Sequence, residues 1–485
     1  MLRRFVTAAL GLAGLVVVLA GCTPEPAETV PVQVWLTTPD RSSLLERQPD
    51  ESLAAPDTDA SAPTSAHEPI VVSPHLRYQS MVGFGASFTD SAAWLVSNSP
   101  HRDDLMTALF DPHNGIGLGF LRQPIGASDF SRSFYTYSDV PPGQNDEGFG
   151  GFTVEHDERY ILPLLRQARQ LNPTLTVMAT PWSAPAWLKN NGSLIGGGLP
   201  ESSYTQYADY LVRFLQAYEA AGVPVAYLSV QNEPEFAPEG YPGMVLSAPE
   251  QTAVIDAVAA AVAQAGLPTK ILGWDHNWDD TAYPLALLTD DAAGNLSGIA
   301  WHCYRGEPAA QAEVRDAFPR GDVFLTECSG SQSADPANTF ADTLAWQADT
   351  LLVGATRNWS RTVTTWNLAL DASGGPVIGS CTRCTGVLVI DGDAVQFNAE
   401  YYVLGHGSRF VRPGAVRIDS GELSSNIHHV AFQNRDGSLV VVALNTNRDA
   451  AEPLRLEWEG FNLGYTLAPG ALATLTWSPP AAGGD

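Results

Sequence analysis

Eight short apolar runs, separated by segments with helical periodicity, constrain the fold of this chain more than any other feature. Residues 204–218 place apolar side chains at helical spacing, and the helical segment 250–265 stops at Gly266. Strands that alternate with helices form parallel sheets, and eight such units predict a closed (β/α)8 barrel. The runs are Met81–Gly85, Gly117–Arg122, Leu175–Ala179, Val225–Val230, Lys270–Trp274, Gly298–Trp301, Val323–Thr326 and Thr362–Trp366.

The rival architecture for this pattern is a doubly wound open sheet. Such a sheet would carry a glycine-rich phosphate loop, G-x-G-x-x-G, after its first strand. Residues 83–90 are GFGASFTD and do not contain this loop. We therefore predict an α/β chain whose barrel spans residues 81–396.

A second unit is predicted from the two ends of the chain. Beyond residue 397, five short apolar runs alternate with turn residues, which is typical of antiparallel strands. Five strands are few for a sandwich, and the run Val32–Thr38 supplies another, so we expect a β-sandwich side domain built from both ends. The expected division outside the barrel is residues 31–80 with a disordered loop over 50–68, residues 397–478, and a tail over 479–485.

The N-terminus has the features of an export signal. Arg3 and Arg4 precede an apolar run over 5–20 that is too short to span a membrane. The run ends in Leu-Ala-Gly-Cys22, which resembles a bacterial lipobox, although an ordinary secretory signal is the alternative. We expect a signal peptide over 1–22, lipidation of Cys22, and a tether over 23–30. The protein is then an exported lipoprotein, at the cell surface or in the periplasm, held to the membrane by its lipid alone.

Charge and cysteine content exclude several classes of function. The formal net charge is −27, and such a field repels nucleic-acid backbones. Cys381 and Cys384 form a C-x-x-C, which in an exported protein favours a local disulfide. The state of Cys303 and Cys328 stays open. Because no second C-x-x-C or paired-histidine motif completes a metal site, we expect no metal and no cofactor.

Polar and aromatic residues gather just past the ends of the apolar runs, where parallel barrels carry their active sites. Glu233 follows the fourth run and Glu327 ends the seventh, so these carboxylates should face each other across the barrel mouth. Two carboxylates on one cavity, surrounded by aromatic rings, suit hydrolysis of a glycosidic bond. The other residues at these ends are Asp90, Arg122, Trp182, Asn232, Asp275, His276, His302, Tyr304 and Trp366.

The motifs around these residues resemble glycoside hydrolase family 30, the family of the glucosylceramidases. The resemblance extends in the right order over nearly the whole stretch from Val32 to Trp477. It implies a retaining mechanism on a (β/α)8 barrel. The matching stretches are GFGASFTDSAAWL (83–95), LRQPIGASDFS (121–131), TPWSAPAWLKNNG (180–192), VQNEPE (230–235), WHCY (301–304), TECSG (326–330), TWNLALD (365–371) and FNAEYYVLGHGSRFVRPGA (397–415).

The resemblance implies a role for each central residue. Glu233 would be the general acid/base, protonated at the start, and Glu327 the ionised nucleophile, so their environments must differ. Arg122 would keep Glu327 charged, and Tyr304 would orient it. Asn232 would bind the sugar 2-hydroxyl. The alternative for Arg122 is a structural ion pair with Asp129.

The remaining residues would shape the sugar pocket. Asp90 would accept hydrogen bonds from hydroxyls on the far side of the glycone, with a helix N-cap as its alternative role. Trp182 and Trp366 would wall the pocket, unless they only pack in the core. Three residues are expected to support the site from behind or to play an uncertain part: His302, Asp275 and His276.

The resemblance implies β-glucosides as substrates, with action like that of a glucosylceramidase or β-glucosidase. Endo-β-1,6-glucanases of the same family are the alternative. The loop 371–375 holds no cationic residue, which argues against a glucuronoxylanase. A non-catalytic glycan-binding lipoprotein is the alternative from a different class, and a transglycosidase would share every residue named above.

Overall fold

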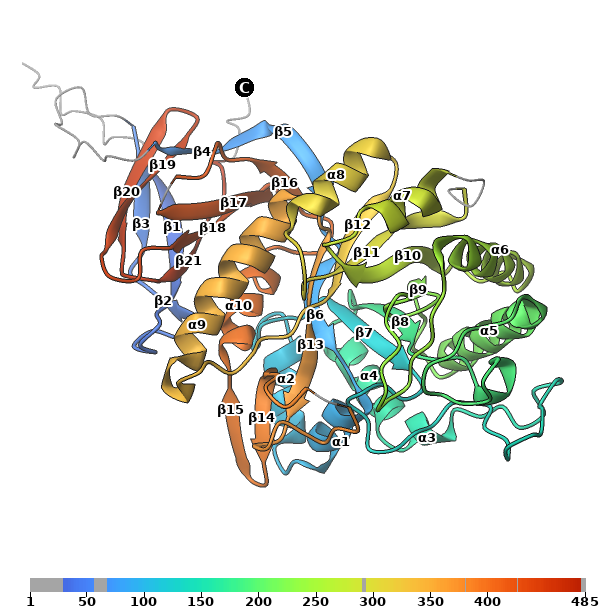
Figure 1. Cartoon of the computed structure of the whole chain (residues 1–485). Helices are drawn as coiled ribbons and strands as arrows, with labels where there is room; N and C mark the ends of the chain where they lie inside the picture. The colour runs from blue at the N-terminus through green and yellow to red at the C-terminus, as the bar shows by residue number, and fades with distance from the viewer. Residues whose placement is uncertain (1–28, 56–67, 290–293, 380, 425, 481–485) are drawn as a thin grey trace, which may run out of the picture.

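The computed structural model describes residues 29–55, 68–289, 294–379, 381–424 and 426–480 (Figure 1). The predicted signal peptide, Cys22, and most of the tether lie outside these residues. The chain folds into a (β/α)8 barrel and an antiparallel β-sandwich, which confirms the predicted fold class. Within the described part, we find no helix whose length and apolar content would let it cross a membrane.

The barrel strands coincide with the eight predicted runs. Their side chains are almost completely buried, because parallel strands in a barrel are covered on both faces. One side chain from each of six neighbouring strands fills the barrel interior: Phe120, Met178, Tyr227, Leu272, Ala300 and Phe324. The strands are β6 (Gly83–Ser87), β7 (Phe120–Ile125), β8 (Thr176–Pro181), β9 (Tyr227–Ser229), β10 (Lys270–Asn277), β11 (Leu296–His302), β12 (Asp322–Glu327) and β13 (Thr362–Leu370).

Strands β12 and β13 close the barrel through a seam that partly uses side chains. The backbone N–H of Arg361 donates to the carbonyl of Val323 at 2.8 Å. The Ser360 hydroxyl accepts from the N–H of Leu325 at 2.9 Å, and Thr362 Oγ1 donates to the Leu325 carbonyl at 3.0 Å. The remaining strand pairs are joined by parallel ladders, with register shifts between β10 and β11, between β11 and β12, and between β13 and β6.

The helices surround the barrel, and an additional hairpin extends its sheet beyond β13 (Figure 1). The hairpin consists of β14 (Gly386–Asp391) and β15 (Ala394–Phe397). The helices are α1 (Asp90–Asn98), α2 (Arg102–Phe110), α3 (Glu155–Glu158), α4 (Ile161–Leu171), α5 (Tyr204–Ala220), α6 (Ala248–Gln264), α7 (Ala282–Thr289), α8 (Ala309–Ala317), α9 (Thr339–Trp346), which continues as a π-helix over Gln347–Ala355, and α10 (Ala399–Ser408), with short 3-10 turns at Ala186–Leu188, Glu201–Ser203 and Pro336–Asn338.

Both chain ends build the sandwich, as predicted, and Figure 1 shows β1 and β3 among the C-terminal strands. Part of the segment expected to be a disordered loop over 50–68 is a strand instead, because Glu51–Ala54 pair with β1, and residues 56–67 lie outside the described part. Alternation of buried and exposed residues explains β1, but β20 lacks a continuous apolar run and was not predicted. The strands are β1 (Thr29–Thr37), β2 (Glu46–Arg47), β3 (Glu51–Ala54), β4 (Ile70–Val71), β5 (Ser73–Ser80), β16 (Val416–Asp419), β17 (Ile427–Gln433), β18 (Leu439–Asn445), β19 (Glu452–Trp458), β20 (Phe461–Leu467) and β21 (Leu472–Trp477).

Helix α10 joins the two units. The buried ring of His406 contacts Thr37 Oγ1 in β1 at 2.9 Å and Thr474 Oγ1 in β21 at 2.8 Å. Gly405 and Gly407 let the helix approach the barrel, since an added Cβ at Gly407 would come within 2.8 Å of the Phe84 ring. The sequence pattern changes near residue 397, but the antiparallel strands start only after this helix, at Val416.

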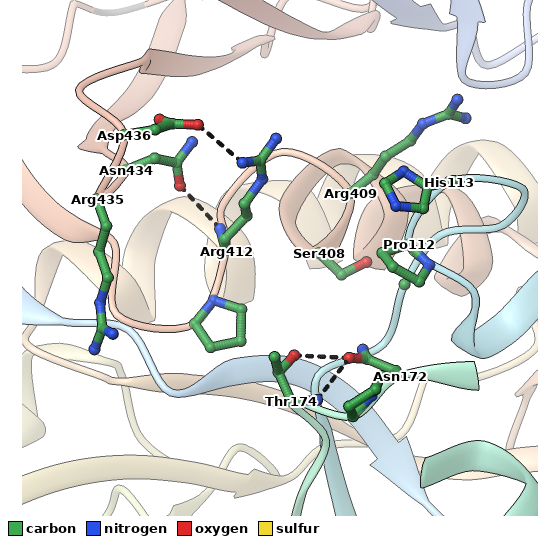
Figure 2. A pocket seen from close by; sticks show the side chains of 13 residues that line it. Pro112, His113, Asn172, Thr174, Ser408, Arg409, Arg412, Asn434, Arg435 and Asp436 are labelled. Carbon is green, nitrogen blue, oxygen red and sulfur yellow. Dashed lines mark hydrogen bonds and ion pairs between the residues drawn. The ribbon is translucent and has the colours of Figure 1, made fainter. Parts of the chain in front are cut away.

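A hollow of about 500 Å³ lies where the barrel meets the sandwich (Figure 2). Its walls come from the loops that lead into β7 and β8 and from the turn between β17 and β18. Ion pairing of Arg412 with Asp436 and a hydrogen bond from Thr174 to Asn172 hold these walls. The hollow is therefore at the N-terminal end of the barrel strands, opposite to the end where such barrels act.

Close contact between β6 and β7 yields a stability prediction. A Cβ added at Gly85 would lie 1.6 Å from the carbonyl oxygen of Phe120, and backbone cannot rotate away. We expect Gly85→Ala to lower the free energy of unfolding by more than about 3 kcal/mol, beyond the usual cost of overpacking. The matched control is Gly464→Ala in β20, where nothing lies within 4 Å of the added Cβ. Urea unfolding of both variants would refute this packing if Gly85→Ala unfolded like the control.

Candidate active site

The carboxyl ends of the barrel strands enclose a cavity of about 180 Å³. It is smaller than typical ligand pockets of about 300–1,000 Å³, so it suits one small unit of a ligand. Both glutamates line it, together with four more of the predicted site residues and the disulfide-bonded Cys381 and Cys384. The lining residues are Asp129, Trp182, Asn232, Glu233, Tyr241, Tyr304, Glu327, Trp366, Cys381 and Cys384.

Arg122 lies beneath this cavity and is completely buried. Its Nη1 donates to Glu327 Oε2, and its Nη2 donates to Asn232 Oδ1 at 2.8 Å and to Asp275 Oδ2 at 2.9 Å. A buried guanidinium needs such partners, because an unpaired charge in the interior is very costly. The predicted contact between Arg122 and Glu327 is present, whereas the alternative ion pair with Asp129 is not formed.

Asp275 is the second buried charge of the site. Its carboxylate accepts from Thr180 Oγ1 at 2.9 Å and from Thr326 Oγ1 at 2.7 Å, besides Arg122. Burial alone would raise the pKa of Asp275, but the charge of Arg122 and the hydrogen bond from His302 lower it strongly. Asp275 therefore remains an anion that fixes Arg122 and His302 from below the cavity.

His302 connects Asp275 to Glu233. Its Nδ1 lies 3.0 Å from Glu233 Oε1, and its Nε2 lies 3.0 Å from Asp275 Oδ1. An imidazole that faces a carboxylate with each nitrogen must donate from both, so the ring is an imidazolium. Burial opposes this charge, but Glu327, Asp275 and Glu233 outweigh burial and raise the pKa of His302 to about 9.

Contacts with two histidines also set the pKa of Glu233. Burial would raise its pKa, but hydrogen bonds from His276 and His302 outweigh burial and hold the pKa of Glu233 well below its usual range. These contacts favour the anionic form of Glu233 in the empty site, with the shared proton on His302. His302 Nδ1, which carries this proton, lies 3.0 Å from Glu233 Oε1. That Glu233 is protonated when the reaction starts stays a prediction.

Glu327 is held at both oxygens. Arg122 donates to Oε2, and the Tyr304 hydroxyl donates to Oε1 at 2.7 Å. The backbone N–H of Tyr304 in turn donates to Asn277 Oδ1 at 2.9 Å, which fixes the loop after β11. These contacts orient the carboxylate before any ligand binds, as preorganised catalysis requires.

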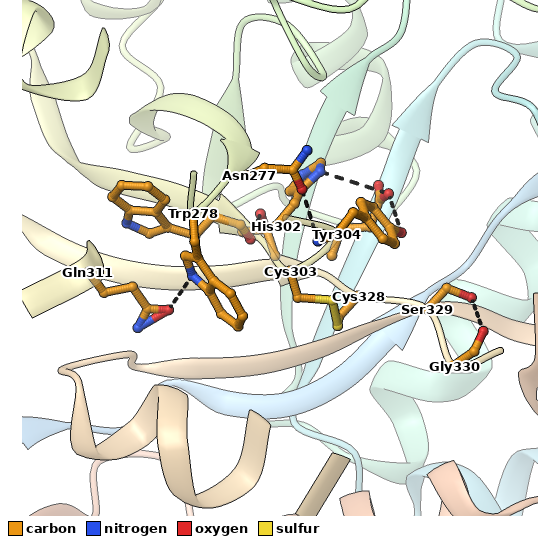
Figure 3. Close-up of a disulfide and its surroundings, with 12 residues drawn as sticks. Asn277, Trp278, His302, Cys303, Tyr304, Gln311, Cys328, Ser329 and Gly330 are labelled. Carbon is orange, nitrogen blue, oxygen red and sulfur yellow. Dashed lines mark hydrogen bonds and ion pairs between the residues drawn. A yellow bond between two sulfur atoms is a disulfide. The ribbon is translucent and has the colours of Figure 1, made fainter. Parts of the chain in front are cut away.

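A disulfide links the loops that carry these residues (Figure 3). Cys303 follows His302, Cys328 follows Glu327, and the two cysteines, whose state the sequence left open, are bonded to each other. The bond joins the ends of the neighbouring strands β11 and β12. It therefore limits the movement of His302 relative to Glu327.

Three side chains of the site lie close enough together to hold a metal ion. Potential ligand atoms of Glu233, His276 and His302 lie within 4.8 Å of one another. However, both nitrogens of His302 face carboxylates and carry protons, and a metal ligand must be a neutral imidazole with a free lone pair. The arrangement therefore serves proton chemistry better than metal binding. His276, 3.4 Å from Glu233 Oε1, supports the same carboxylate.

Trp182 and Trp366 form one wall of the cavity. Their rings stack on each other, with centroids 4.9 Å apart and planes inclined by 21°. The Arg122 guanidinium lies 5.0 Å from the Trp182 ring centroid and 5.7 Å from that of Trp366. The two roles considered for these residues are thus combined, because the rings are packed among neighbours and still line the cavity.

Asp90 does not line the cavity, and its predicted contact with the glycone stays a prediction. Its carboxylate is buried and accepts from His156 Nε2 at 2.7 Å, from the Tyr160 hydroxyl, and from the N–H of Arg132 at 2.8 Å. The N-cap of α1 is Thr89 instead. These three donors hold the carboxylate of Asp90 among the loops behind the cavity.

Asp129 is one of two cavity residues that sequence reasoning missed, the other being Tyr241. Its Oδ1 is buried and has no hydrogen-bond partner among the described residues. Burial and the negative charge of Glu327 raise its pKa to about 8, although a hydrogen bond from Trp366 opposes this rise. Asp129 lies in the motif 121–131, seven residues after Arg122, and its distance from the strand end concealed it.

Comparison with known proteins places this geometry in a family. The model of the glycosyl hydrolase family 30 TIM-barrel domain matches residues 81–411, and that of the family's β-sandwich domain matches 414–475. The chain belongs to glycosyl hydrolase family 30. This confirms the predicted family of retaining β-glycosidases and the predicted enzyme class of glycoside hydrolase.

Several relatives of this family 30 chain have names that state an activity. It is 32% identical over 397 residues to Endo-1,6-beta-D-glucanase neg1 of Aspergillus fumigatus, covering 76% of this chain and 79% of that protein. It is also 32% identical over 399 residues to Putative glucosylceramidase 1 of Caenorhabditis elegans, with coverages of 76% and 74%. The solved structure of the endo-beta1,6-glucanase BT3312 superposes with a TM-score of 0.83 at 28% identity, covering 92% of this chain and all of that one.

The charged state of His302 makes stability depend on pH. Its folded pKa of about 9 exceeds the ordinary 6.5, so protonation stabilises the fold fully below pH 6.5. This contribution is lost as the pH rises through 9. The difference in unfolding free energy between the wild type and His302→Gln should therefore shrink, by on the order of 3 kcal/mol, between these pH values.

His406→Gln is the matched control for this measurement. Burial lowers the pKa of His406 to about 3, so its ring is neutral in the folded and the unfolded chain above pH 6.5. Its effect on unfolding free energy should then be constant over the same pH range. Equally constant offsets for both variants, measured by urea unfolding, would contradict an imidazolium at position 302.

Proposed function

We propose that this chain is a retaining endo-β-1,6-glucanase that acts by double displacement on Glu233 and Glu327. The observation that carries the proposal is the convergence of both carboxylates on one atom, since Glu233 Oε1 and Glu327 Oε1 lie 3.0 Å and 3.9 Å from His302 Nδ1. Such proximity suits the separation of about 5–5.5 Å in retaining enzymes. The names of the Aspergillus relative and of BT3312 support the β-1,6 linkage.

In the first step, Glu327 attacks the anomeric carbon while the leaving glycosidic oxygen takes a proton from Glu233. Arg122 and Tyr304 donate to the two carboxylate oxygens of Glu327 and hold it in position. Glu233 receives its proton from His302 Nδ1 along their hydrogen bond, so the approaching oxygen draws a proton that the empty site stores on the imidazolium.

In the second step, Glu233 accepts a proton from water, and the oxygen of that water displaces Glu327 from the anomeric carbon. The configuration is retained because the carbon is inverted twice. Asn232, fixed by Arg122, is placed to bind the sugar 2-hydroxyl, and Asp129 is an acceptor or donor for the other hydroxyls of the glycone. The wall of Trp182 and Trp366 gives the ring an apolar face to pack on.

A glucosylceramidase or β-glucosidase is the second candidate, because Putative glucosylceramidase 1 of Caenorhabditis elegans has the same sequence identity of 32% to this chain. Both activities would use the same pair of glutamates. They differ in what lies beyond the cleaved bond, which is a further glucosyl unit in one case and a lipid or small aglycone in the other.

Product analysis on three substrates distinguishes these candidates. We expect residues 23–485 to release oligosaccharides early from β-1,6-glucan, and to cleave aryl β-glucoside and detergent-dispersed glucosylceramide far more slowly. Release of glucose from the lipid or aryl glucoside with the polymer intact would contradict the proposal and favour the second candidate. The isosteric variant Glu327→Gln is the control, with turnover lower by about 10⁴-fold or more and an unchanged circular dichroism spectrum.

We further propose that the enzyme is exported and anchored through a lipid on Cys22. The motif Leu-Ala-Gly-Cys22 after an apolar run supports this proposal. Palmitate labelling in a bacterial host should mark the full chain and leave Cys22→Ser unlabelled in the soluble exported fraction. Equal labelling of both, or of neither, would contradict the anchor.

A further inference from the structure

A second hollow adjoins the catalytic cavity on the outer side of Tyr304. Its volume is about 340 Å³, nearly twice that of the catalytic cavity. Tyr304 lines both spaces, and Cys303, which is bonded to Cys328 (Figure 3), lines the second. The residues that line the second hollow are Cys303, Tyr304, Ser329, Ser331, Asp342, Thr343 and Trp346.

Trp346 is the main aromatic surface of this hollow. It lies at the last residue of α9, where the helix changes to π geometry, and 40% of its surface is exposed. Such helical irregularities are frequent at functional sites. Tyr304 is 42% exposed although its hydroxyl is bonded to Glu327, so both aromatic side chains remain accessible to a ligand.

Polar groups surround these rings. Ser329, Ser331 and Thr343 contribute hydroxyls, and Asp342 contributes a carboxylate. The carboxylate is already fixed by Ser333 Oγ at 2.5 Å and by Arg448 Nη1 at 2.7 Å. Accessible aromatic faces with neutral hydroxyls and a fixed acceptor fit a neutral, polyhydroxylated ligand, since sugars combine apolar ring faces with hydroxyl groups.

The position of the hollow indicates which part of a substrate it meets. The acid Glu233 is held by His276 of β10 and His302 of β11, and Tyr304 follows β11 directly. The tryptophan wall, which the proposed function places against the glycone, consists of Trp182 directly after β8 and Trp366 in β13. A chain that leaves the cavity past the acid therefore runs toward the hollow.

The structure assigns this hollow to the leaving-group side of a β-linked glucan, with Trp346 as the platform for a glucosyl unit beyond the cleaved bond. The assignment rests on the proposed function for its substrate class. It explains how the enzyme could act within a polymer, because cleavage inside a chain requires binding on both sides of the bond.

The test compares Trp346→Ala with the wild type on β-1,6-linked gluco-oligosaccharides of two to six units and on aryl β-glucoside. We expect kcat/KM for the longest oligosaccharides to fall about tenfold, while aryl glucoside turnover changes less than about twofold, because only long substrates reach the hollow. Trp346→Phe should restore most of the loss. Leu76→Ala, an exposed side chain on β5, should change neither substrate.

An equal loss on aryl glucoside, or no loss on the long oligosaccharides, would overturn the assignment. If the wild type cleaved none of the β-1,6-linked oligosaccharides, the proposed function would fail. The hollow would then be tested by transfer of a glucosyl group from aryl glucoside to an added oligosaccharide. In that case, gluco-oligosaccharides added to aryl glucoside should receive the glucosyl group in the wild type and not in Trp346→Ala. Equal transfer in both proteins would overturn the hollow as a sugar site.

Discussion

The ion pairs of buried Arg122 support the rest of the catalytic geometry. One guanidinium contacts the carboxylates of Glu327 and Asp275 and the amide of Asn232, which come from three different strand ends. Removing Asp275 or Glu327 would break a buried ion pair, at a cost of about 3–5 kcal/mol. The strand ends are therefore locked to one another by charge, and the cavity keeps its shape without a ligand.

This charge arrangement sets the protonation of the site. Asp275 and Glu233 both face His302, so the proton needed for catalysis is held on an imidazolium between them. The backbone contributes as well, because Glu233 and Asp275 adopt φ values of 46° and 64°. Non-glycine residues in this left-handed region cost on the order of 1–3 kcal/mol and persist only where the surroundings enforce them. Here the enforced backbone turns both carboxylates toward His302.

Most of the site could be predicted from sequence by reading the residues at the ends of the strands, because a barrel brings the ends of all its strands together in one ring. This reading succeeded for Arg122 and Glu327, which lie on strands, and for Glu233, which lies four residues past β9. It failed for Asp90 and Asp129, which lie on segments after strand ends, where loop geometry and not periodicity decides direction. Asp90 lies only three residues past β6, as near to its strand end as a catalytic residue would be. Only its contacts with His156 and Tyr160 show that its side chain points away from the cavity.

Other features could not be predicted because they depend on contacts between residues far apart in the sequence, which no local pattern reveals. The helix α10 was not predicted, since its two glycines are poor helix formers and are explained only by the close approach of Phe84 and Ile116. The proton on His302 depends on three carboxylates from three strands. The pairing of Cys303 with Cys328 similarly required the neighbouring register of β11 and β12.

The central claim is that Glu327 forms a covalent bond to the sugar, and trapping tests it most directly. A 2-deoxy-2-fluoro β-glucoside with a good leaving group should inactivate the enzyme, because the fluorine slows release of the glycosyl group more than its formation. Mass spectrometry of the digested protein should then find one fluoroglucosyl group, attached to Glu327. Attachment to Glu233, or inactivation of Glu327→Gln at the wild-type rate, would contradict the account.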